Sequence, residues 1–273
     1  MGQGLRPRGS LRRGRRHPID IVGERKRLGS ILEEVGAIAL HHFHSVRASL
    51  KPDGSQVTVA DVAVEKALTT LLREHYPTCG IRAEEGERVS GTAGTWYVDP
   101  IDGTGAFLDG LAHWGPSICL VDDEGPVVGA TWFPLVGELY YARRGHGAYR
   151  NGVRLAPEPL VTIRRNHCIL VPSRFHRLPA LDWPGKARGL GSTAAHLALV
   201  AAGGPVATVI GDEWRMWDVG AGSLMVREAG LSIVDIQGDV YHPTQDRGTA
   251  FIAGSPAAIE ILLPLFQSLQ RTV

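Results

Sequence analysis

In the first part of the chain, apolar residues recur with the three- and four-residue spacing of an amphipathic helix. Between about residues 19 and 45, one helical face would carry Leu28, Ile31, Leu32, Val35, Ile38 and Ala39. A second apolar face follows, made of Val64, Leu68, Leu71 and Leu72, and it stops before Pro77. Thr58 and Asp61 are spaced as a variant of the capping box, so we expect the second helix to begin there. The pattern therefore predicts two helices before the first long strand.

From Trp96 to Tyr149 the pattern changes to short apolar runs and alternation with a period of two. Turn residues at Asp122 to Gly125 and at Asn151-Gly152 separate these runs, which predicts an antiparallel meander. After about residue 155, strand-like runs alternate with helical ones, and the last helix is expected to have Ser255 as its cap and Pro256 at its first position. We expect an α+β half over 18–155 and an α/β half over 156–273.

Composition places the chain among ordinary globular proteins. Of its 273 residues, 44% are hydrophobic and 21% are charged. No apolar run approaches the roughly 18 residues that a membrane span needs. The three cysteines, Cys79, Cys119 and Cys168, form no metal or disulfide spacing pattern. We therefore expect a cytoplasmic protein with reduced cysteines and no membrane partner.

The charge is unevenly distributed along the chain. Residues 1–17 contain six arginines and no acid, so the rest of the chain has 23 basic against 28 acidic residues. Such a segment can contact nucleic acid or act as an organellar address, and it can also be a disordered extension or the product of a start codon placed too far upstream. Because it has no aromatic residue to stack on bases, we interpret it as a disordered extension and expect no nucleic-acid partner.

The stretch WYVDPIDGTGAF, residues 96 to 107, carries the clearest chemistry. Asp99 and Asp102 follow a strand and flank Pro100, so a tight turn would bring their carboxylates together, which favours a hard cation between them. The backbone N–H groups of Gly103 and Thr104 could bind an anion if a helix begins there. A cation site beside an anion site suits a phosphate ester on Mg²⁺. The alternative is a plain turn with two capping aspartates. The P-loop and EF-hand patterns are absent.

Other acids strengthen the metal interpretation. Glu84 and Glu85 lie about a dozen residues before the first aspartate, in a loop-like stretch. Asp218 is expected at the start of a helix, where it could also serve only as an N-cap. With the DPIDGT turn, these separate carboxylates could hold two or three Mg²⁺ ions.

Four ordered blocks of sequence resemble one family. WYVDPIDGT and, about 115 residues later, WDVGAGSLMVREAG resemble the two signatures of the inositol monophosphatase family of Mg²⁺-dependent, lithium-sensitive phosphatases. DGSQVTVADVAVEKAL and AEEGE precede them in the family's order, and GSTAAHLALVAAGG resembles the segment before the second signature. The likeness covers roughly residues 25 to 255. It implies a layered αβαβα sandwich and a homodimer.

The resemblance also implies roles for individual residues. A first metal ion would be held by Glu84, Asp99 and the carbonyl of Ile101, a second by Asp99, Asp102 and Asp218, and a weaker third by Glu84. Thr104, hydrogen-bonded to Asp61, would orient or deprotonate a metal-held water. The implied catalytic set is Asp61, Thr104 and Glu84. The implied substrate-binding set is Asp102, Gly103, Thr104, Gly191, Ser192, Thr193 and Glu213.

Departures from the family pattern concern the substrate. The usual Asn-Phe after DGT is Ala106-Phe107 here, and Gly230 is followed by Leu231. Gly211 stands where inositol-specific members have a glutamate, with Asp212 and Glu213 just after it. PSRFH (172–176) faintly resembles a segment of the bisphosphate-nucleotidase branch. Inositol 1-phosphate is the default substrate, and histidinol phosphate, a 3′-phosphoadenosine nucleotide or a non-catalytic role in binding phosphorylated ligands stay open.

Overall fold

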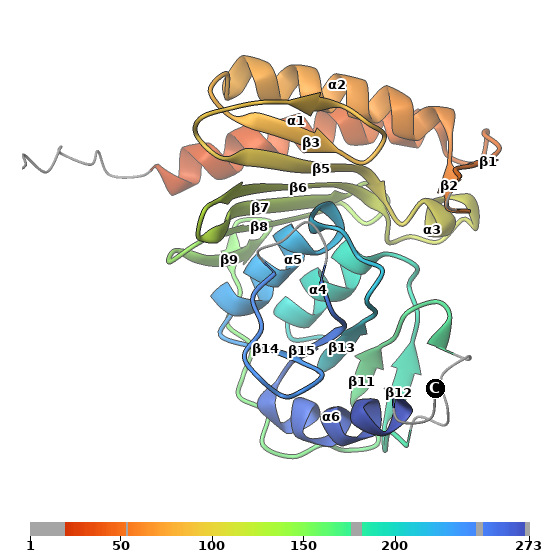
Figure 1. The fold of residues 1–273 in the computed structure, drawn as a ribbon, viewed down its shortest axis with the longest axis vertical. Coiled ribbons are helices and arrows are strands. Elements are labelled where there is room, and N and C mark those ends of the chain that lie inside the picture. Colours follow the sequence, from red (N-terminus) through yellow and green to blue (C-terminus); the bar gives the residue numbers. More distant parts are fainter. Residues whose placement is uncertain (1–19, 53, 176–181, 244–247, 271–273) are drawn as a thin grey trace, which may run out of the picture.

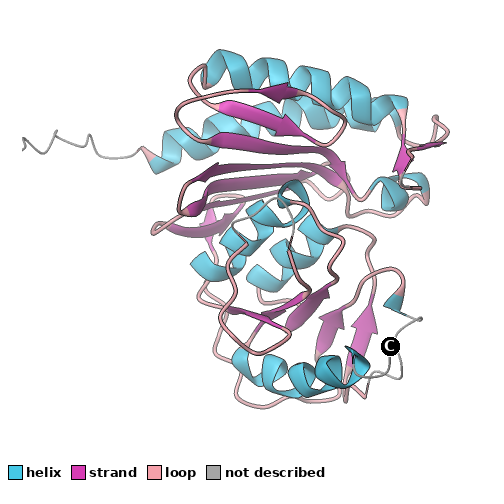
Figure 2. Ribbon diagram, viewed as in Figure 1, coloured by secondary structure: helices cyan, strands magenta, loops and turns pink. Residues whose placement is uncertain are grey.

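The computed structural model describes residues 20–52, 54–175, 182–243 and 248–270. The predicted extension over residues 1–17 lies outside them. Figure 1 shows five layers stacked along the long axis of the molecule, with the chain passing from the first layers to the last. Figure 2 shows that helical and sheet layers alternate.

The outermost layer consists of α1 (Ile21–His42) and α2 (Val59–His75), which pack against each other and against one face of a large sheet (Figure 1). The side chain of Asp20 caps α1 by accepting a hydrogen bond from the Gly23 N–H. The capping box predicted for α2 is confirmed: Thr58 and Asp61 each accept a backbone hydrogen bond from the other. Both helices begin where local side chains satisfy their first N–H groups.

The second layer is an eight-stranded sheet in the order β10-β9-β8-β7-β6-β5-β3-β4. Its strands are β3 (Gly80–Ala83), β4 (Arg88–Val89), β5 (Thr95–Asp102), β6 (Gly115–Asp122), β7 (Gly125–Phe133), β8 (Glu138–Arg143), β9 (Gly147–Arg150) and β10 (Val153–Arg154). The predicted meander is confirmed, since all pairs from β5 to β10 are antiparallel. β3 instead runs parallel to β5, which brings the carboxyl ends of these two strands to the same edge. A short hairpin, β1 (Ser49–Leu50) and β2 (Gln56–Val57), lies near this edge.

The third layer is formed by α4 (Thr193–Ala201) and α5 (Met216–Glu228), which lie between the two sheets (Figure 1). Helix α5 contacts the large sheet closely at Gly129 of β7. A Cβ at this position would come within 2.6 Å of the Ala221 Cα, so only glycine allows this approach.

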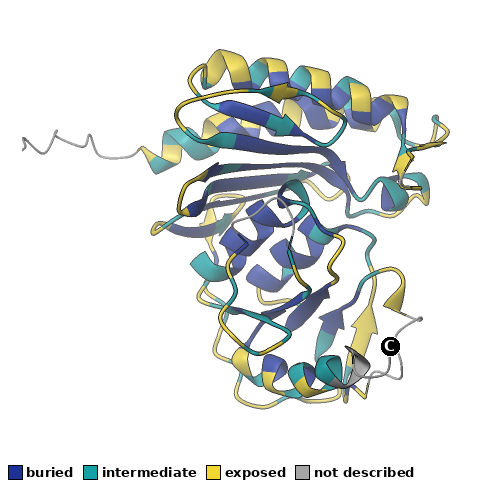
Figure 3. Ribbon diagram, in the orientation of Figure 1, coloured by how far each residue is buried: buried dark blue, intermediate teal, exposed yellow. Residues whose placement is uncertain are grey.

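The last two layers are a five-stranded sheet and α6 (Pro256–Gln270), which begins after its Ser255 cap as predicted. The strands, in the order β12-β11-β13-β15-β14, are β11 (Cys168–Leu170), β12 (Lys186–Arg188), β13 (Ala207–Ile210), β14 (Ser232–Asp235) and β15 (Phe251–Gly254). Apolar side chains fill the spaces between successive layers, and Figure 3 shows burial concentrated there. The αβαβα sandwich is confirmed. Among the described residues, no helix has the length and apolar character needed to cross a membrane.

Candidate active site

A cavity of about 280 Å³ lies where the end of β5 meets the beginnings of three helices. These helices are α4, α5 and α3 (Thr104–Leu108), which is a short helix directly after β5. The cavity is lined by Ser55, Gln56, Glu84, Asp99, Ile101, Asp102, Gly103, Thr104, Gly105, Gly191, Thr193 and Asp218. The β1–β2 hairpin, β5, the segment before α4 and the first turn of α5 therefore meet around one space.

Three carboxylates converge on this cavity. Asp99, Asp102 and Asp218 each place one oxygen within 4.8 Å of the others. In a regular strand, residues three apart face opposite sides. Here the register shifts: Asp99 pairs with Ser117, whereas Asp102 pairs with Gly115. This irregularity inserts an extra residue in β5 and turns both aspartates toward the same space.

Hydrogen bonds fix each of these carboxylates. The Ile101 N–H donates to Asp99 Oδ1 at 2.9 Å. Asp102 Oδ1 accepts from the Ala194 N–H at 3.0 Å and from the Ser192 hydroxyl, so the beginning of α4 holds the end of β5.

The alternative that Asp218 serves only as the N-cap of α5 is wrong. Asp218 is not the N-cap but the third residue of the helix, and its Oδ2 accepts from the Arg215 N–H at 2.5 Å. The helix begins three residues earlier than an N-cap at Asp218 would require, and the Asp218 carboxylate folds back over the first turn and still lines the cavity.

Burial and mutual repulsion raise the pKa of every member of the cluster. The pKa of Asp99 lies well above its ordinary value because of burial, then because of Glu84, Asp102 and Asp218. Burial likewise raises the pKa of Asp218, and it raises that of Asp102 to about 7, although Ser192 and Ala194 partly oppose it. A divalent cation would relieve this repulsion, and carboxylate oxygens are the ligands that Mg²⁺ prefers. The donor set therefore fits this ion.

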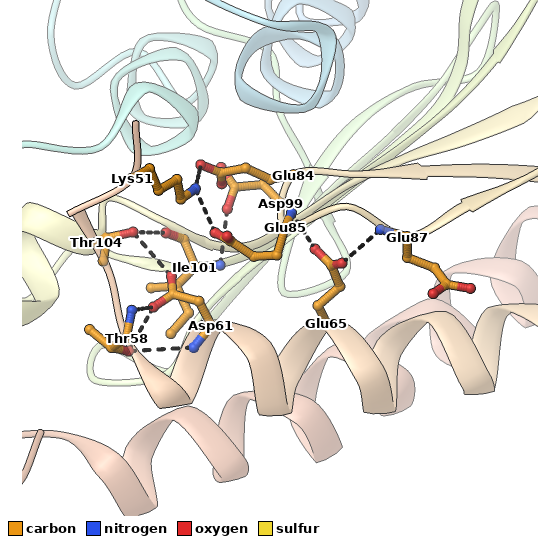
Figure 4. Close-up of polar contacts among 10 residues, drawn as sticks. All are labelled: Lys51, Thr58, Asp61, Glu65, Glu84, Glu85, Glu87, Asp99, Ile101 and Thr104. Carbon is orange, nitrogen blue, oxygen red and sulfur yellow. Dashed lines mark hydrogen bonds and ion pairs between the residues drawn. The ribbon is translucent and has the colours of Figure 1, made fainter. Parts of the chain in front are cut away.

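A threonine–aspartate pair lies beside the cluster. The Thr104 hydroxyl lies 3.1 Å from Asp61 Oδ1 and 3.2 Å from the Ile101 carbonyl oxygen. Figure 4 draws both contacts as dashed lines. Asp61 is fully buried, and its other oxygen accepts from the Thr58 N–H at 2.8 Å and from the Thr58 hydroxyl at 2.6 Å. Burial raises the pKa of Asp61. The aspartate thus both caps α2 and holds the Thr104 hydroxyl, as the sequence suggested.

Lys51 is a site residue that the sequence analysis missed. It follows β1, and its Nζ lies 2.7 Å from Oε1 of Glu84 and 2.7 Å from Oε1 of Glu85 (Figure 4). Burial lowers the pKa of Lys51, but the hydrogen bonds to the two glutamates outweigh it, so the net pKa is raised. Its two partners are 33 and 34 positions away in sequence, and no local pattern could have paired them. Glu84 lines the cavity, with its carboxylate bound to this ammonium group.

The remaining predicted substrate-binding residues lie in two places. Gly103 adopts φ +87°, and a Cβ there would come within 2.8 Å of the Ser192 Cβ, so glycine is required between β5 and α3. Gly191 and Thr193 line the cavity, whereas the buried Ser192 caps α4 and reaches the cavity only through Asp102. Glu213 is exposed in the loop before α5 and is not part of the lining. Its role in binding a substrate stays a prediction.

The chain is similar to proteins of one family over nearly its whole length. The model of the inositol monophosphatase family matches residues 24–271. An inositol-1-monophosphatase of Rhizobium meliloti is 34% identical over 214 residues, which cover 71% of this chain and 77% of that protein. A histidinol-phosphatase of Chlorobaculum parvum is 30% identical over 219 residues, covering 76% and 84%. The crystal structure of the extragenic suppressor protein suhB from Bartonella henselae matches with a TM-score of 0.78 at 27% identity, covering 90% of this chain and 98% of that one.

Proposed function

Because the chain belongs to the inositol monophosphatase family and is a phosphoric monoester hydrolase, we propose that it is a Mg²⁺-dependent enzyme acting on a small alcohol phosphate. Inositol 1-phosphate is the default substrate. The observation that carries the proposal is the convergence of three carboxylates from β5 and α5 on one cavity, within 4.8 Å of one another.

Asp99, Asp102 and Asp218 are the residues that would hold Mg²⁺ between the two halves of the chain. Glu84 and the Ile101 carbonyl, both on the cavity wall, would complete the coordination of two to three ions. When bound, Mg²⁺ supplies a Lewis acid that acidifies the attacking water and offsets negative charge on the phosphate and the leaving oxygen.

The protein's own groups would orient the reactants. The Thr104 hydroxyl donates a hydrogen bond to the Asp61 carboxylate. The lone pairs of the Thr104 oxygen are therefore left to accept a hydrogen bond from a water in the cavity. Thr104 would then hold this water in line with the phosphorus atom and take up its proton as the hydroxyl proton moves to Asp61. The N–H groups at Gly103 and Thr104 would bind phosphate oxygens, because the first donors of a helix have no intrahelical acceptor.

Histidinol phosphate is the second candidate substrate. The similarity to a histidinol-phosphatase is close to the similarity to an inositol-1-monophosphatase, at 30% against 34% identity. In addition, Gly211 supplies no side chain at the position where a glutamate would grip an inositol ring. A 3′-phosphoadenosine nucleotide and a purely ligand-binding role rest on the sequence alone.

Family membership also supports three broader expectations. We expect a cytoplasmic enzyme that is inhibited by lithium and works as a homodimer. Sedimentation velocity and inhibition by LiCl test the last two directly.

The test of the proposed function is release of inorganic phosphate by the full-length chain. Inositol 1-phosphate, histidinol phosphate, 3′-phosphoadenosine 5′-phosphate and fructose 1,6-bisphosphate are each incubated with excess Mg²⁺ or with EDTA. We expect one ester to be strongly preferred and its turnover to vanish with EDTA. Equal phosphate release with EDTA would contradict the metal mechanism, and the absence of release from every ester would favour the ligand-binding alternative.

A further inference from the structure

Helix α2 carries a second buried carboxylate, which the proposed chemistry does not use. Glu65 lies four residues after Asp61, so the two side chains share one face of the helix. Both are buried, with 0% of Asp61 and 6% of Glu65 exposed. Figure 4 shows that Asp61 points to Thr104, while Glu65 points to the turn that contains Glu84 and Glu85.

Glu65 binds this turn through its backbone. One carboxylate oxygen, Oε2, accepts from the Glu85 N–H at 2.7 Å, and the other, Oε1, accepts from the Glu87 N–H at 3.1 Å. A buried carboxylate is costly unless hydrogen bonds compensate it, and these are charge-assisted bonds to two otherwise free backbone donors. Glu65 therefore ties both ends of the turn to α2.

Besides these two bonds to Glu65, ion pairs of Lys51 with Glu84 and Glu85 and of Arg73 with Glu87 hold side chains of the turn. Its closing bonds run from the Ala83 N–H to the Glu87 carbonyl at 2.9 Å and from the Glu84 N–H to the Val98 carbonyl at 3.0 Å. Gly86, in its middle, adopts φ +126° and would have open space around a Cβ. Packing therefore does not hold the tip of this turn, and the position of the Glu84 carboxylate depends on the backbone bonds that hold the turn and on the ion pair with Lys51.

We propose that Glu65 is a positioning residue for Glu84: it fixes the 84–87 turn so that the Glu84 carboxylate stays on the wall of the metal cavity. This inference rests on the proposed function. Because Asp61 and Glu65 are one helical turn apart on α2, the helix also fixes where Glu84 lies relative to the Thr104–Asp61 pair. One rigid element thus aligns a metal ligand with the group that holds the water.

The test compares Glu65→Ala and Glu65→Gln with the wild-type protein. Mg²⁺ binding is measured by calorimetry without substrate, and hydrogen exchange is measured at the amides of residues 85 and 87. Loss of a side chain that orients a metal ligand weakens metal binding by roughly 10- to 100-fold in other proteins. We expect a weakening of this order for the weakest Mg²⁺ site in Glu65→Ala, with faster amide exchange. Glu65→Gln should show a smaller change, since its amide oxygen still accepts one bond.

Glu24→Gln is the matched control. Glu24 is a half-buried carboxylate of α1 that binds the Tyr141 hydroxyl at 2.6 Å and Arg143 at 2.7 and 2.8 Å, and it is not among the residues that line the cavity. The Glu24→Gln substitution should lower the melting temperature of the protein without changing its affinity for Mg²⁺. Saturating Mg²⁺ should restore most of the kcat of Glu65→Gln, which a merely destabilised protein would not show.

Two outcomes separate this inference from the proposed function. If the wild-type protein binds Mg²⁺ and releases phosphate but Glu65→Gln and Glu65→Ala match it in Mg²⁺ affinity and amide exchange, Glu65 does not position Glu84. If the wild-type protein itself binds no Mg²⁺, the proposed function is wrong, and the role assigned to Glu65 is wrong with it.

Discussion

Two regions that we propose to contact the substrate differ in how firmly they are held. The first, the carboxylate wall, comprises Asp61, Asp99, Asp102 and Thr104, whose side chains are bonded to backbone or to each other. The second, residues 211–213, is exposed and lies between β13 and the buried Trp214. A Cβ on Gly211 would have no atom within 4 Å.

The difference indicates that the residues of the proposed metal site are held firmly, whereas the loop proposed to contact the substrate is not. A metal site must hold several like charges together, so each carboxylate needs its own support. A loop such as 211–213, if it contacts only the alcohol part of a substrate, holds no buried cluster of like charges and needs no such support. Sequence relatives of this chain bear different names, among them an inositol-1-monophosphatase and a histidinol-phosphatase.

The largest effect is expected from removing one charge from the carboxylate wall. An asparagine side chain at position 99 keeps the oxygen that accepts the Ile101 N–H and loses only the negative charge. Because a metal contributes several kcal/mol to transition-state stabilisation, Asp99→Asn should lower kcat/KM by roughly 10³-fold or more. Steady-state phosphate release measures this, with circular dichroism as the check on folding. Wild-type activity in a folded Asp99→Asn protein would break the proposed division between the two regions.

The next largest effect is expected at the threonine. Thr104→Val replaces the hydroxyl by a methyl group of similar size and leaves the buried Asp61 without this partner. Proton transfer by a positioned group contributes about 10²- to 10⁴-fold, so kcat should fall by about 10²-fold or more, whereas Thr104→Ser should keep most of it. Thr69→Val, at a buried threonine of α2 that does not line the cavity, is the control and should leave kcat unchanged. Equal rates for Thr104→Val and wild type would remove Thr104 from the reaction.

A smaller but pH-dependent effect is expected on thermal stability. In the metal-free protein the folded pKa of Asp102 is about 7. The unfolded value is about 3.9, so the folded state binds more protons between these values and its stability falls as pH rises through this window. Mg²⁺ binds the deprotonated carboxylates. The increase in melting temperature caused by Mg²⁺ should therefore be larger at about pH 8 than at about pH 5.5. Calorimetric melting with Mg²⁺ and with EDTA measures this increase in melting temperature. An equal increase at both pH values would argue against metal binding at the cluster of Asp99, Asp102 and Asp218.

The smallest effect is expected in the open loop. Glu213→Gln keeps the shape of an exposed side chain and removes its charge, so kcat/KM should change by less than about tenfold, which is the scale of one weak polar contact. The change should differ between esters and appear mainly in KM. A uniform loss in kcat for all substrates would show that the loop takes part in the chemistry.

Much of the fold could be predicted from local patterns. The α2 capping box and the meander from β5 to β9 follow from side-chain spacing and turn residues, which act over a few positions. The order of the five layers could not be obtained in this way, since it depends on which apolar faces meet, and only the family resemblance supplied it.

The site was predicted where its residues lie close together in sequence. Asp99, Asp102 and Thr104 lie close together where β5 ends and α3 begins. Lys51 and Glu65 were missed because their partners lie in the turn after β3, far away in sequence, and because Glu65 stands within an apolar helical face beside Val64 and Leu68. Tertiary contacts, which no periodicity records, bring Lys51 and Glu65 to the turn that carries Glu84.

The most direct test of the division between fixed chemistry and open substrate contacts uses Asp218→Asn on at least two esters that the wild-type enzyme hydrolyses. The amide oxygen of the substituted side chain can still accept the Arg215 N–H, so α5 should begin as before. We predict that kcat/KM falls by the same large factor for both esters, roughly 10³-fold. Unchanged rates, or a loss confined to one ester, would contradict the assignment of Asp218 to a metal site that serves every substrate.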